Sequence, residues 1–219
     1  MNSILNKMLE SLPQNGGKWA PELLEITREL FQGYRLFADL EKPAVSIFGS
    51  ARFKQDHPYC VIAKECGFLS AKAGFTVITG AGPGIMEAAS EGAKEAGGKT
   101  LGANIVVPHE QRPNPYVDKH FTFKNFFTRK VMLTEYSDGF IIFPGGFGTL
   151  DELVEILNLM ATNKLKKRPL VLIGTSYWKN LLAWLKTELL EAKTIDPSSL
   201  EMIHLVDDAV KAVEFIQSK

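Results

Sequence analysis

One ten-residue segment, 143–152, combines groups that could bind an anion and act on it. It reads Phe-Pro-Gly-Gly-Phe-Gly-Thr-Leu-Asp-Glu and joins an apolar run to a helical pattern. Glycines at 145, 146 and 148 allow positive φ and close approach of a ligand. The amides at the start of the following helix carry partial positive charge, which favours a phosphate. Glu152 then lies one turn away, beside the group that the phosphate is attached to.

Glu152 has two physically sound roles. Thr149 to Glu152 fits the Ser/Thr-x-x-Glu capping box, in which the glutamate bends back to the first amide of the helix. Alternatively, Glu152 projects into a cleft, where the positive helix end favours its ionised form. An ionised carboxylate suits a base, a nucleophile or a stabiliser of positive charge better than a proton donor. Asp151 could share that task or cap the helix instead.

Two adjacent basic residues, Arg129 and Lys130, lie in a helical pattern ahead of the strand that feeds this loop. Adjacent helical positions differ by about 100°, so at most one of them aims into a cleft. We expect Arg129, because its planar fork suits a phosphate or a carboxylate, whereas Lys130 fits a solvated face equally well. Four aromatic side chains nearby either form core or offer a face for a base: Phe121, Phe123, Phe126 and Phe127.

The elements that must position these residues alternate along the chain. Short apolar runs at 44–48, 75–79, 100–107, 140–143 and 169–173 predict strands, separated mostly by helix-length amphipathic segments. Runs that are apolar on both faces predict a Rossmann-like, doubly wound parallel α/β sheet with helices on both faces. Ligands bind beyond the carboxyl ends of such strands. Three strands end in glycine-bearing turns, at 49–52, 80–84 and 143–152, so we expect these turns to converge on one cleft.

The turn Gly80-Ala-Gly-Pro-Gly84 does not fit the dinucleotide fingerprint, because of its proline and its tight spacing. It is either a tight strand-to-helix turn or a place where Gly82 and Gly84 let the backbone approach ribose or phosphate. Ser50, in the neighbouring turn, is a further candidate for substrate binding. A P-loop ATPase is excluded, because no Gly-Lys-Ser/Thr follows any of the glycine turns.

The first forty residues differ from the rest. After Pro21, apolar residues recur at helical spacing: Leu23, Ile26, Leu30, Tyr34 and Phe37. This stripe fits packing on the same chain's core and contact with a second subunit equally well. We therefore expect an N-terminal helical extension at 1–42 and a Rossmann-like nucleotide-binding catalytic domain at 43–219.

Composition excludes several classes of protein. The chain has 219 residues, enough for one sizeable core. Lys plus Arg and Asp plus Glu both number 25, so no global field attracts nucleic acid or a membrane. There is no apolar run of about 18 residues and no signal-peptide layout at the start, which predicts a cytoplasmic protein.

Cysteine and histidine usage predicts neither a disulfide nor a metal site. Cys60 and Cys66 are six residues apart on a predicted helix, and we interpret both as buried thiols. Metal-ligand spacing is absent from the four histidines, His57, His109, His120 and His204. We expect no metal and no cofactor.

Three segments together resemble the LOG family, often labelled lysine-decarboxylase-like. They are Gly82-Pro-Gly-Ile-Met-Glu87, Phe127-Thr-Arg-Lys130 and Pro144-Gly-Gly-Phe-Gly-Thr-Leu-Asp-Glu152. The family signature is Pro-Gly-Gly-x-Gly-Thr-x-x-Glu with an upstream Arg-Lys, and Ser46 to Arg52 is typical of its bacterial members. The resemblance runs from about residue 44 onward. Ala81 stands where many members have glycine, a change that should leave the turn intact.

The resemblance implies a homodimer that cleaves the N-glycosidic bond of a nucleoside 5′-monophosphate to free base and ribose 5-phosphate. The base would be a cytokinin, or adenine or another purine. Arg129 and Glu152 match the family's catalytic pair, and the segment from Gly145 through Thr149 would hold the 5′-phosphate. Lys130 and Glu110 would also contact the nucleotide. A carrier of nucleotides or of the molybdenum cofactor on the same fold is the alternative.

Overall fold

The fold is built on one parallel sheet. The computed structural model describes residues 19–38, 40, 43–108 and 112–218, and within them one seven-stranded sheet has the order β4-β3-β2-β1-β5-β6-β7. All neighbouring strands pair in parallel. The predicted doubly wound parallel α/β fold is confirmed. The strands are β1 (Ala44–Phe48), β2 (Thr76–Thr79), β3 (Thr100–Ile105), β4 (Lys119–Phe123), β5 (Gly139–Ile142), β6 (Leu170–Ile173) and β7 (Ile203–Val206).

The five predicted strands all form, and two further strands close the edges of the sheet. β1, β2, β3, β5 and β6 are the buried runs that the sequence indicated. β4 is largely exposed and its sequence, Lys-His-Phe-Thr-Phe, alternates polar and apolar residues. β7 is half-buried over most of its length. Edge strands carry this weaker pattern because only part of their surface is covered, and both were therefore missed.

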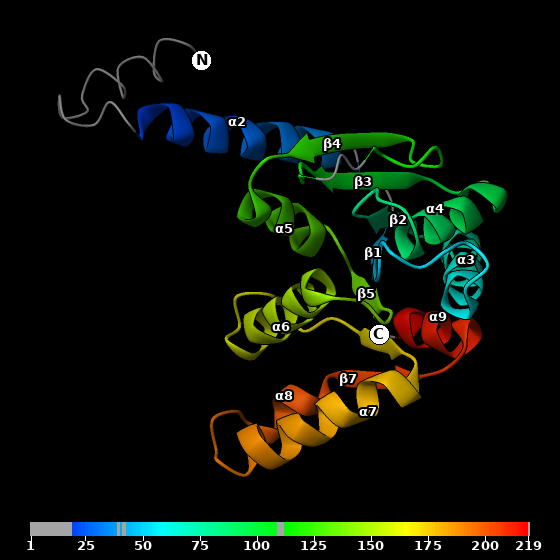
Figure 1. Cartoon of the computed structure of the whole chain (residues 1–219), viewed down its shortest axis with the longest axis vertical. Coiled ribbons are helices and arrows are strands. Elements are labelled where there is room, and N and C mark those ends of the chain that lie inside the picture. Colours follow the sequence, from blue (N-terminus) through cyan, green and yellow to red (C-terminus); the bar gives the residue numbers. More distant parts are fainter. Residues whose placement is uncertain (1–18, 39, 41–42, 109–111, 219) are drawn as a thin grey trace.

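Helices cover both faces of the sheet (Figure 1). One face packs on α3 (Pro58–Lys72), α4 (Ile85–Glu95) and α9 (Ala209–Gln217). The other packs on α2 (Ala20–Phe37), α5 (Phe126–Glu135), α6 (Phe147–Ala161) and α7 (Thr175–Trp184), and α7 continues into η2 (Leu185–Leu190), which α8 (Pro197–Glu201) follows. The side chains of β1 alternate between these cores, since Val45 and Ile47 face the first and Ala44 and Phe48 the second. Cys60 and Cys66 are buried free thiols of α3, as predicted.

The strand order reverses at the centre of the sheet, between β1 and β5. In doubly wound sheets a crevice forms at this point, outside the carboxyl ends of the strands. Backbone hydrogen bonds join the turns there. The amide of Ser50 donates to Pro144 O at 3.0 Å, and the amide of Ile85 donates to Ser50 O at 3.1 Å. The three glycine-bearing turns thus meet at this point, as expected, but only those at 49–52 and 143–152 contribute residues to the cavity there.

Helix α2 packs one face on its own chain and exposes the other. Phe37 is fully buried, and Gly33 lies so close to α5 that a Cβ there would be 2.8 Å from the sulfur of Met132. Leu23 and Tyr34 are exposed by 42% and 46%. Packing on the same chain is therefore confirmed for part of the stripe, while a subunit contact stays a prediction. The division at residues 42 and 43 also stays a prediction, in the interval between the end of α2 and the start of β1.

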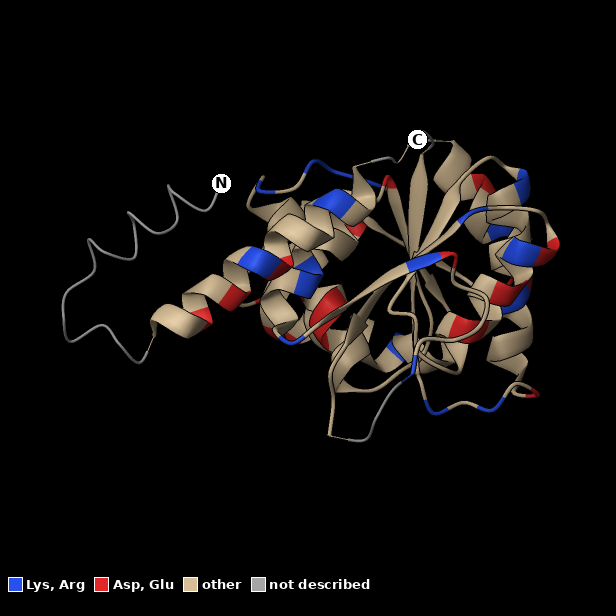
Figure 2. Cartoon of the chain, turned by 90° about the horizontal axis from the view of Figure 1, so that it is seen from above, with Lys and Arg blue, Asp and Glu red and all other residues tan. Residues whose placement is uncertain are grey.

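Charged residues of both signs are interspersed over the helices (Figure 2), in keeping with a net charge of zero. No helix of the described chain is both long and apolar enough to cross a lipid bilayer.

Candidate active site

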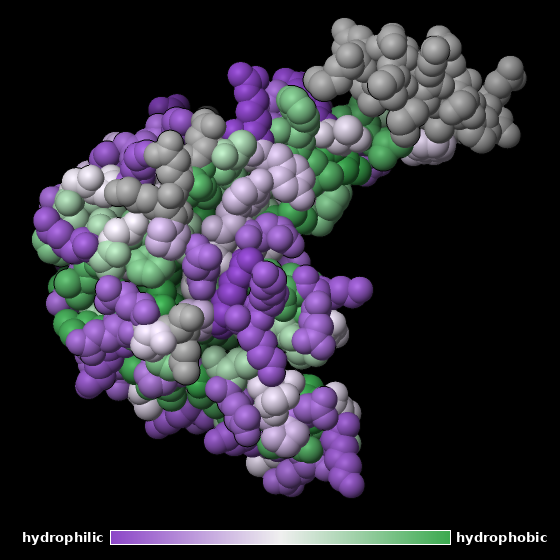
Figure 3. All heavy atoms as spheres, turned by 180° about the vertical axis from the view of Figure 1, so that it is seen from behind, coloured by the Kyte–Doolittle hydropathy of each residue, from purple (hydrophilic) through white to green (hydrophobic). Residues whose placement is uncertain are grey.

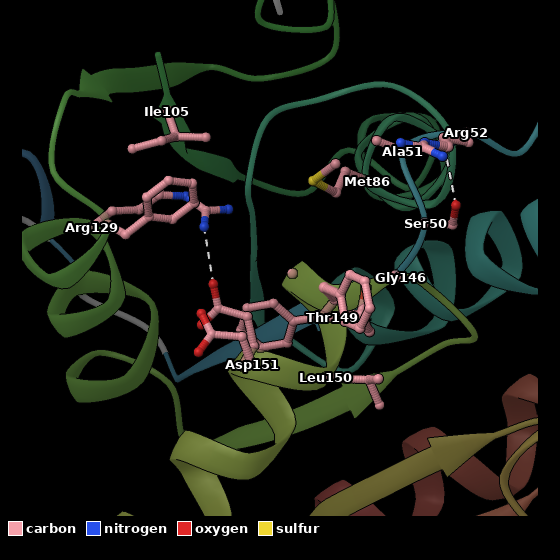
Figure 4. Close-up of a pocket in the computed structure, with 16 residues that line it drawn as sticks. Ser50, Ala51, Arg52, Met86, Ile105, Arg129, Gly146, Thr149, Leu150 and Asp151 are labelled. Carbon is pink, nitrogen blue, oxygen red and sulfur yellow. Dashed lines mark hydrogen bonds and ion pairs between the residues drawn. The ribbon is translucent and has the colours of Figure 1, made fainter. Parts of the chain in front are cut away.

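A cavity of about 650 Å³ opens at the central switch point of the sheet. Its wall consists of the turn at 49–52, the first turns of α6 at 146–152, and side chains from β3, α4 and α5. In Figure 4, Ser50, Ala51 and Arg52 lie across the cavity from Arg129, and Gly146, Thr149 and Asp151 lie on its α6 side. Apolar surface comes from Met86, Ile105 and Phe126.

Arg129 and Glu152 form a buried ion pair in this wall. Arg129 Nη1 donates to Glu152 Oε1 at 2.9 Å, and Arg129 Nε donates to the carbonyl oxygen of Ala103 at 2.8 Å. The two charged residues are exposed by only 9% and 4%. Gly80 makes room for the guanidinium, since a Cβ at residue 80 would lie 2.5 Å from Arg129 Nη2. The predicted catalytic pair is thus brought together by α5, α6 and β3.

Burial dominates the protonation of Glu152. It raises the pKa of this carboxyl from 4.5 to about 7, although the positive charges of Arg129 and Lys130 oppose the shift. Oε2 is buried and has no hydrogen-bond partner among the described residues. Desolvation thus offsets the preference of the positive helix end for the ionised form, which was the expectation for Glu152. A carboxyl with this pKa can both accept and donate a proton near neutral pH.

The capping-box interpretation of Glu152 is also wrong. Helix α6 begins at Phe147, and its N-cap is Gly146 in an extended conformation, without a side-chain cap. Thr149 therefore lies inside the first turn instead of preceding it. Because the helix starts earlier than the capping box requires, the Glu152 side chain is free to reach Arg129.

The glycines of the loop act differently from the expectation. None of Gly145, Gly146 and Gly148 has positive φ. A Cβ on Gly145 would lie 2.1 Å from Thr149 Oγ1, so this glycine permits close packing behind the cavity wall. Gly146 and Gly148 line the cavity, and a Cβ on either would meet no atom within 4 Å. They leave the amide-bearing end of α6 open to a ligand.

Several other predicted site residues do not line the cavity. Lys130 Nζ pairs with Asp151 at 2.8 Å and with Glu155 at 2.8 Å, which turns it toward α6. Gly82 and Gly84 shape the turn behind the wall. Gly84 has φ +67°, and a Cβ there would lie 2.4 Å from Ser50 O. Glu110 lies outside the described residues.

The predicted Ser50 and Thr149 do line the cavity, together with residues that sequence reasoning missed. Arg52 places an exposed cation there, and its position in the turn after β1 was an available signal. Phe147 is 92% exposed, and nothing in the glycine pattern around it had indicated a role for its side chain. The role of Gly80 depends on where the folded chain places the guanidinium of Arg129. No local sequence pattern indicates that position. No group of His, Cys, Asp or Glu with metal-binding geometry occurs among the described residues.

Comparison with known proteins places this site in a family. Residues 86–216, more than half of the chain, match the family described as possible lysine decarboxylase. The chain belongs to this family, also called LOG. It is 29% identical to the cytokinin riboside 5′-monophosphate phosphoribohydrolase of Mycobacterium tuberculosis over 160 residues, which cover 69% of this chain and 82% of that protein.

Two further similarities are to proteins with different functions. The pyrimidine/purine nucleotide 5′-monophosphate nucleosidase of Escherichia coli is 32% identical over 109 residues, which cover 45% of this chain and 24% of that protein. Among solved structures, the molybdenum cofactor carrier protein of Chlamydomonas reinhardtii has 26% identity and a TM-score of 0.60, with 81% of this chain and 98% of that chain covered. Enzymes and a carrier thus share this LOG fold.

One departure from the usual LOG pattern is accommodated as expected. Ala81, where many members have glycine, adopts φ +58°. Its turn keeps the hydrogen bonds from Ala81 N to Thr79 Oγ1 at 3.1 Å and from Asn114 N to Ala81 O at 2.8 Å. The small alanine side chain therefore leaves the turn intact.

The raised pKa of Glu152 predicts a specific dependence of stability on pH. Between its ordinary pKa of 4.5 and about 7, the folded chain holds a proton at Glu152 that the unfolded chain has lost. The free energy of unfolding should therefore fall as pH rises through this window, by about 3 kcal/mol. Urea unfolding of wild type and Glu152→Gln from pH 4 to 8 measures the effect. Identical pH dependence in the two proteins would contradict it.

Gly80→Ala should displace Arg129. The added methyl group would lie 2.5 Å from the guanidinium and 2.7 Å from the sulfur of Met86, so we expect a loss of about 1–3 kcal/mol in stability. Gly148→Ala is the matched control, because its methyl group would meet no atom within 4 Å. Urea unfolding of both variants measures the difference. Equal stability of the two would show that the site tolerates the methyl group.

Proposed function

We propose that the chain is a phosphoribohydrolase. It cleaves the N-glycosidic bond of a purine nucleoside 5′-monophosphate, AMP or a cytokinin nucleotide, and releases free base and ribose 5-phosphate. The observation that carries this proposal is the buried Arg129–Glu152 pair beside the open end of α6. The names of the Mycobacterium and Escherichia relatives support the same class of reaction.

The start of α6 provides the place for the 5′-phosphate. Amides of a first helical turn lack partners within the helix and favour an anion. Gly146 and Gly148 leave that end unobstructed, and Thr149 adds a hydroxyl to the cavity wall. Arg52, across the cavity, adds a positive charge. Glu152, one turn further along α6, then lies beside the ribose.

Hydrolysis replaces the bond from C1′ to the base nitrogen with a bond from C1′ to a water oxygen. Positive charge develops at C1′ and negative charge on the departing base, so an ionised Glu152 stabilises the sugar. Its pKa of about 7 also lets it accept the proton that the attacking water loses and pass it on to the base, whose nitrogen keeps the electron pair of the broken bond. The Arg129 guanidinium, fixed by Ala103 O and Glu152, supplies positive charge at the opposite end of the breaking bond.

The exposed aromatic rings of the cavity support a planar base as leaving group. Phe126 and Phe147 are exposed by 52% and 92%. Both contribute to the cavity wall. Solvent-exposed phenyl rings gain free energy when a planar ligand covers them. They do not discriminate adenine from a cytokinin base, so both remain in the proposal.

A nucleotide or molybdenum cofactor carrier is the second candidate, on the strength of the carrier structure from Chlamydomonas. A carrier requires the anion site but no proton-transfer group at the sugar. The buried carboxyl of Glu152, with its pKa of about 7, therefore favours the enzyme.

Replacement of Glu152 should separate the two candidates. We expect wild type to release ribose 5-phosphate and free base from at least one member of a panel of nucleoside 5′-monophosphates. Glu152→Gln should be slower by about 100-fold to 10,000-fold while remaining folded, because it cannot accept a proton. The exposed Glu191→Gln is the control. Chromatography of the products measures the rates, and nucleotide binding without release by wild type would support the carrier.

We further propose that the chain forms a homodimer through the exposed side of α2. Exposed side chains with large apolar surfaces gather there: Trp19, Leu23, Phe31 and Tyr34. Figure 3 shows hydrophobic surface along the arm that α2 forms. Large exposed apolar side chains in one place are typical of interaction surfaces.

Lysines on this face of α2 should prevent the association. The double variant Leu23→Lys, Tyr34→Lys should have half the wild-type mass by light scattering, since both side chains are exposed in the single chain. Val61→Lys, which changes an exposed residue of α3, should keep the wild-type mass. A monomeric wild type, or a double variant with unchanged mass, would refute this interface.

A further inference from the structure

Helix α2 inserts a charged residue into the interior. Glu29 is only 1% exposed, although α2 lies at the outside of the fold. Its carboxylate accepts hydrogen bonds from the amide of Lys124, from the amide of Asn125 at 3.3 Å, from Asn125 Nδ2 at 3.0 Å and from Thr128 Oγ1 at 2.6 Å. All these donors lie at the start of α5.

These contacts keep Glu29 ionised. Burial alone would raise the pKa of its carboxyl, but the hydrogen bonds from Thr128, Lys124 and Asn125 together lower it below its ordinary value. The carboxylate therefore stands as a negative charge at the positive end of α5. Asn125, the N-cap residue of α5, makes no side-chain cap of its own. The capping group of this helix thus comes from another helix almost a hundred positions away in sequence.

Arg129 follows directly from this capped turn. Its amide donates to Asn125 O at 3.3 Å, and its neighbour Thr128 is fully buried against Glu29. The direction in which Arg129 leaves α5 depends on that turn being formed. Its guanidinium must meet both Ala103 O and Glu152 Oε1, at 2.8 and 2.9 Å, so a small rotation of the turn breaks both contacts.

We propose that Glu29 is a positioning residue for Arg129. By capping α5 from α2, it holds the first turn of α5 in the conformation that presents the guanidinium to Glu152. The effect of this positioning on catalysis rests on the proposed function, whereas the positioning of Arg129 by Glu29 does not. Because α2 precedes the residues 86–216 that match the family, part of the support of the site comes from outside that match.

The opposite end of α5 provides a matched control. Arg168 Nη1 donates to the carbonyl oxygens of Thr134 and Glu135, the latter at 3.2 Å. This cation caps the carboxyl end of the same helix, where positive charge is favourable. Arg168→Gln therefore weakens α5 at the end that does not carry Arg129.

The pKa of Glu152 reports the position of Arg129 without any substrate. Nearby Arg129 lowers this pKa, so a displaced guanidinium should raise it. Carbon-13 NMR titration of glutamate-labelled protein measures it, with Glu152→Gln to assign the signal. We expect a rise of about half a unit or more in Glu29→Ala, and a rise in Arg129→Gln. Arg168→Gln should leave the pKa of Glu152 at its wild-type value while lowering thermal stability.

A second variant tests the proposal even if Glu29→Ala does not fold. Glu29→Gln keeps the size of the side chain and one accepting oxygen but lacks the charge, so it should fold and give a smaller rise than Glu29→Ala. An unchanged pKa of Glu152 in either folded Glu29 variant would overturn the proposal and leave Glu29 a structural cap. If the pKa rises but wild type hydrolyses no nucleotide, the positioning stands and the proposed function fails.

Discussion

The burial of Arg129 against Glu152 is the constraint on which the rest of the structure depends. An arginine and a glutamate removed from water lose hydration, and one ion-pair contact does not replace it. The guanidinium therefore needs the second acceptor supplied by Ala103 O, and it needs the space left by Gly80. Removal of one partner from such a pair typically costs about 3–5 kcal/mol, because the other charge stays buried. The geometry of the site and the stability of the fold are consequently linked.

The fold satisfies this constraint through parts of the chain that are distant in sequence. The reversal of strand order between β1 and β5 brings the turns that follow these strands together, and Ser50 joins them by its backbone. Helix α5 is then fixed at both ends by charges of the appropriate sign, Glu29 at its start and Arg168 at its end. Both capping charges come from outside α5. The direction of Arg129 is thus a property of the tertiary structure.

This dependence explains what the sequence could and could not predict. The buried strands were readable because a parallel sheet requires apolar side chains on both faces, whereas β4 and β7 at the edges lack that pattern. The glycine-bearing turns predicted the position of the cavity, because glycines that directly follow parallel strands are visible in the local sequence. The start of α6 was predicted wrongly. Thr149 and Glu152 satisfy the capping-box rule, but the helix begins earlier, with Gly146 as its N-cap. The raised pKa of Glu152 was not predictable from the sequence, since local spacing carries no information about desolvation.

The same desolvation supports the proposed hydrolysis over the carrier alternative. Burial raises the pKa of the Glu152 carboxyl from 4.5 to about 7, which makes its ionised form less favourable than it is in water. Binding a phosphate at the start of α6 does not require this arrangement, because the helix amides suffice. A proton-transfer step at the adjacent sugar does benefit, since its rate is greatest when the acid or base has a pKa near the working pH. The burial of Glu152 therefore supports the proposed hydrolysis, which uses a proton-transfer group at the sugar, over the carrier alternative.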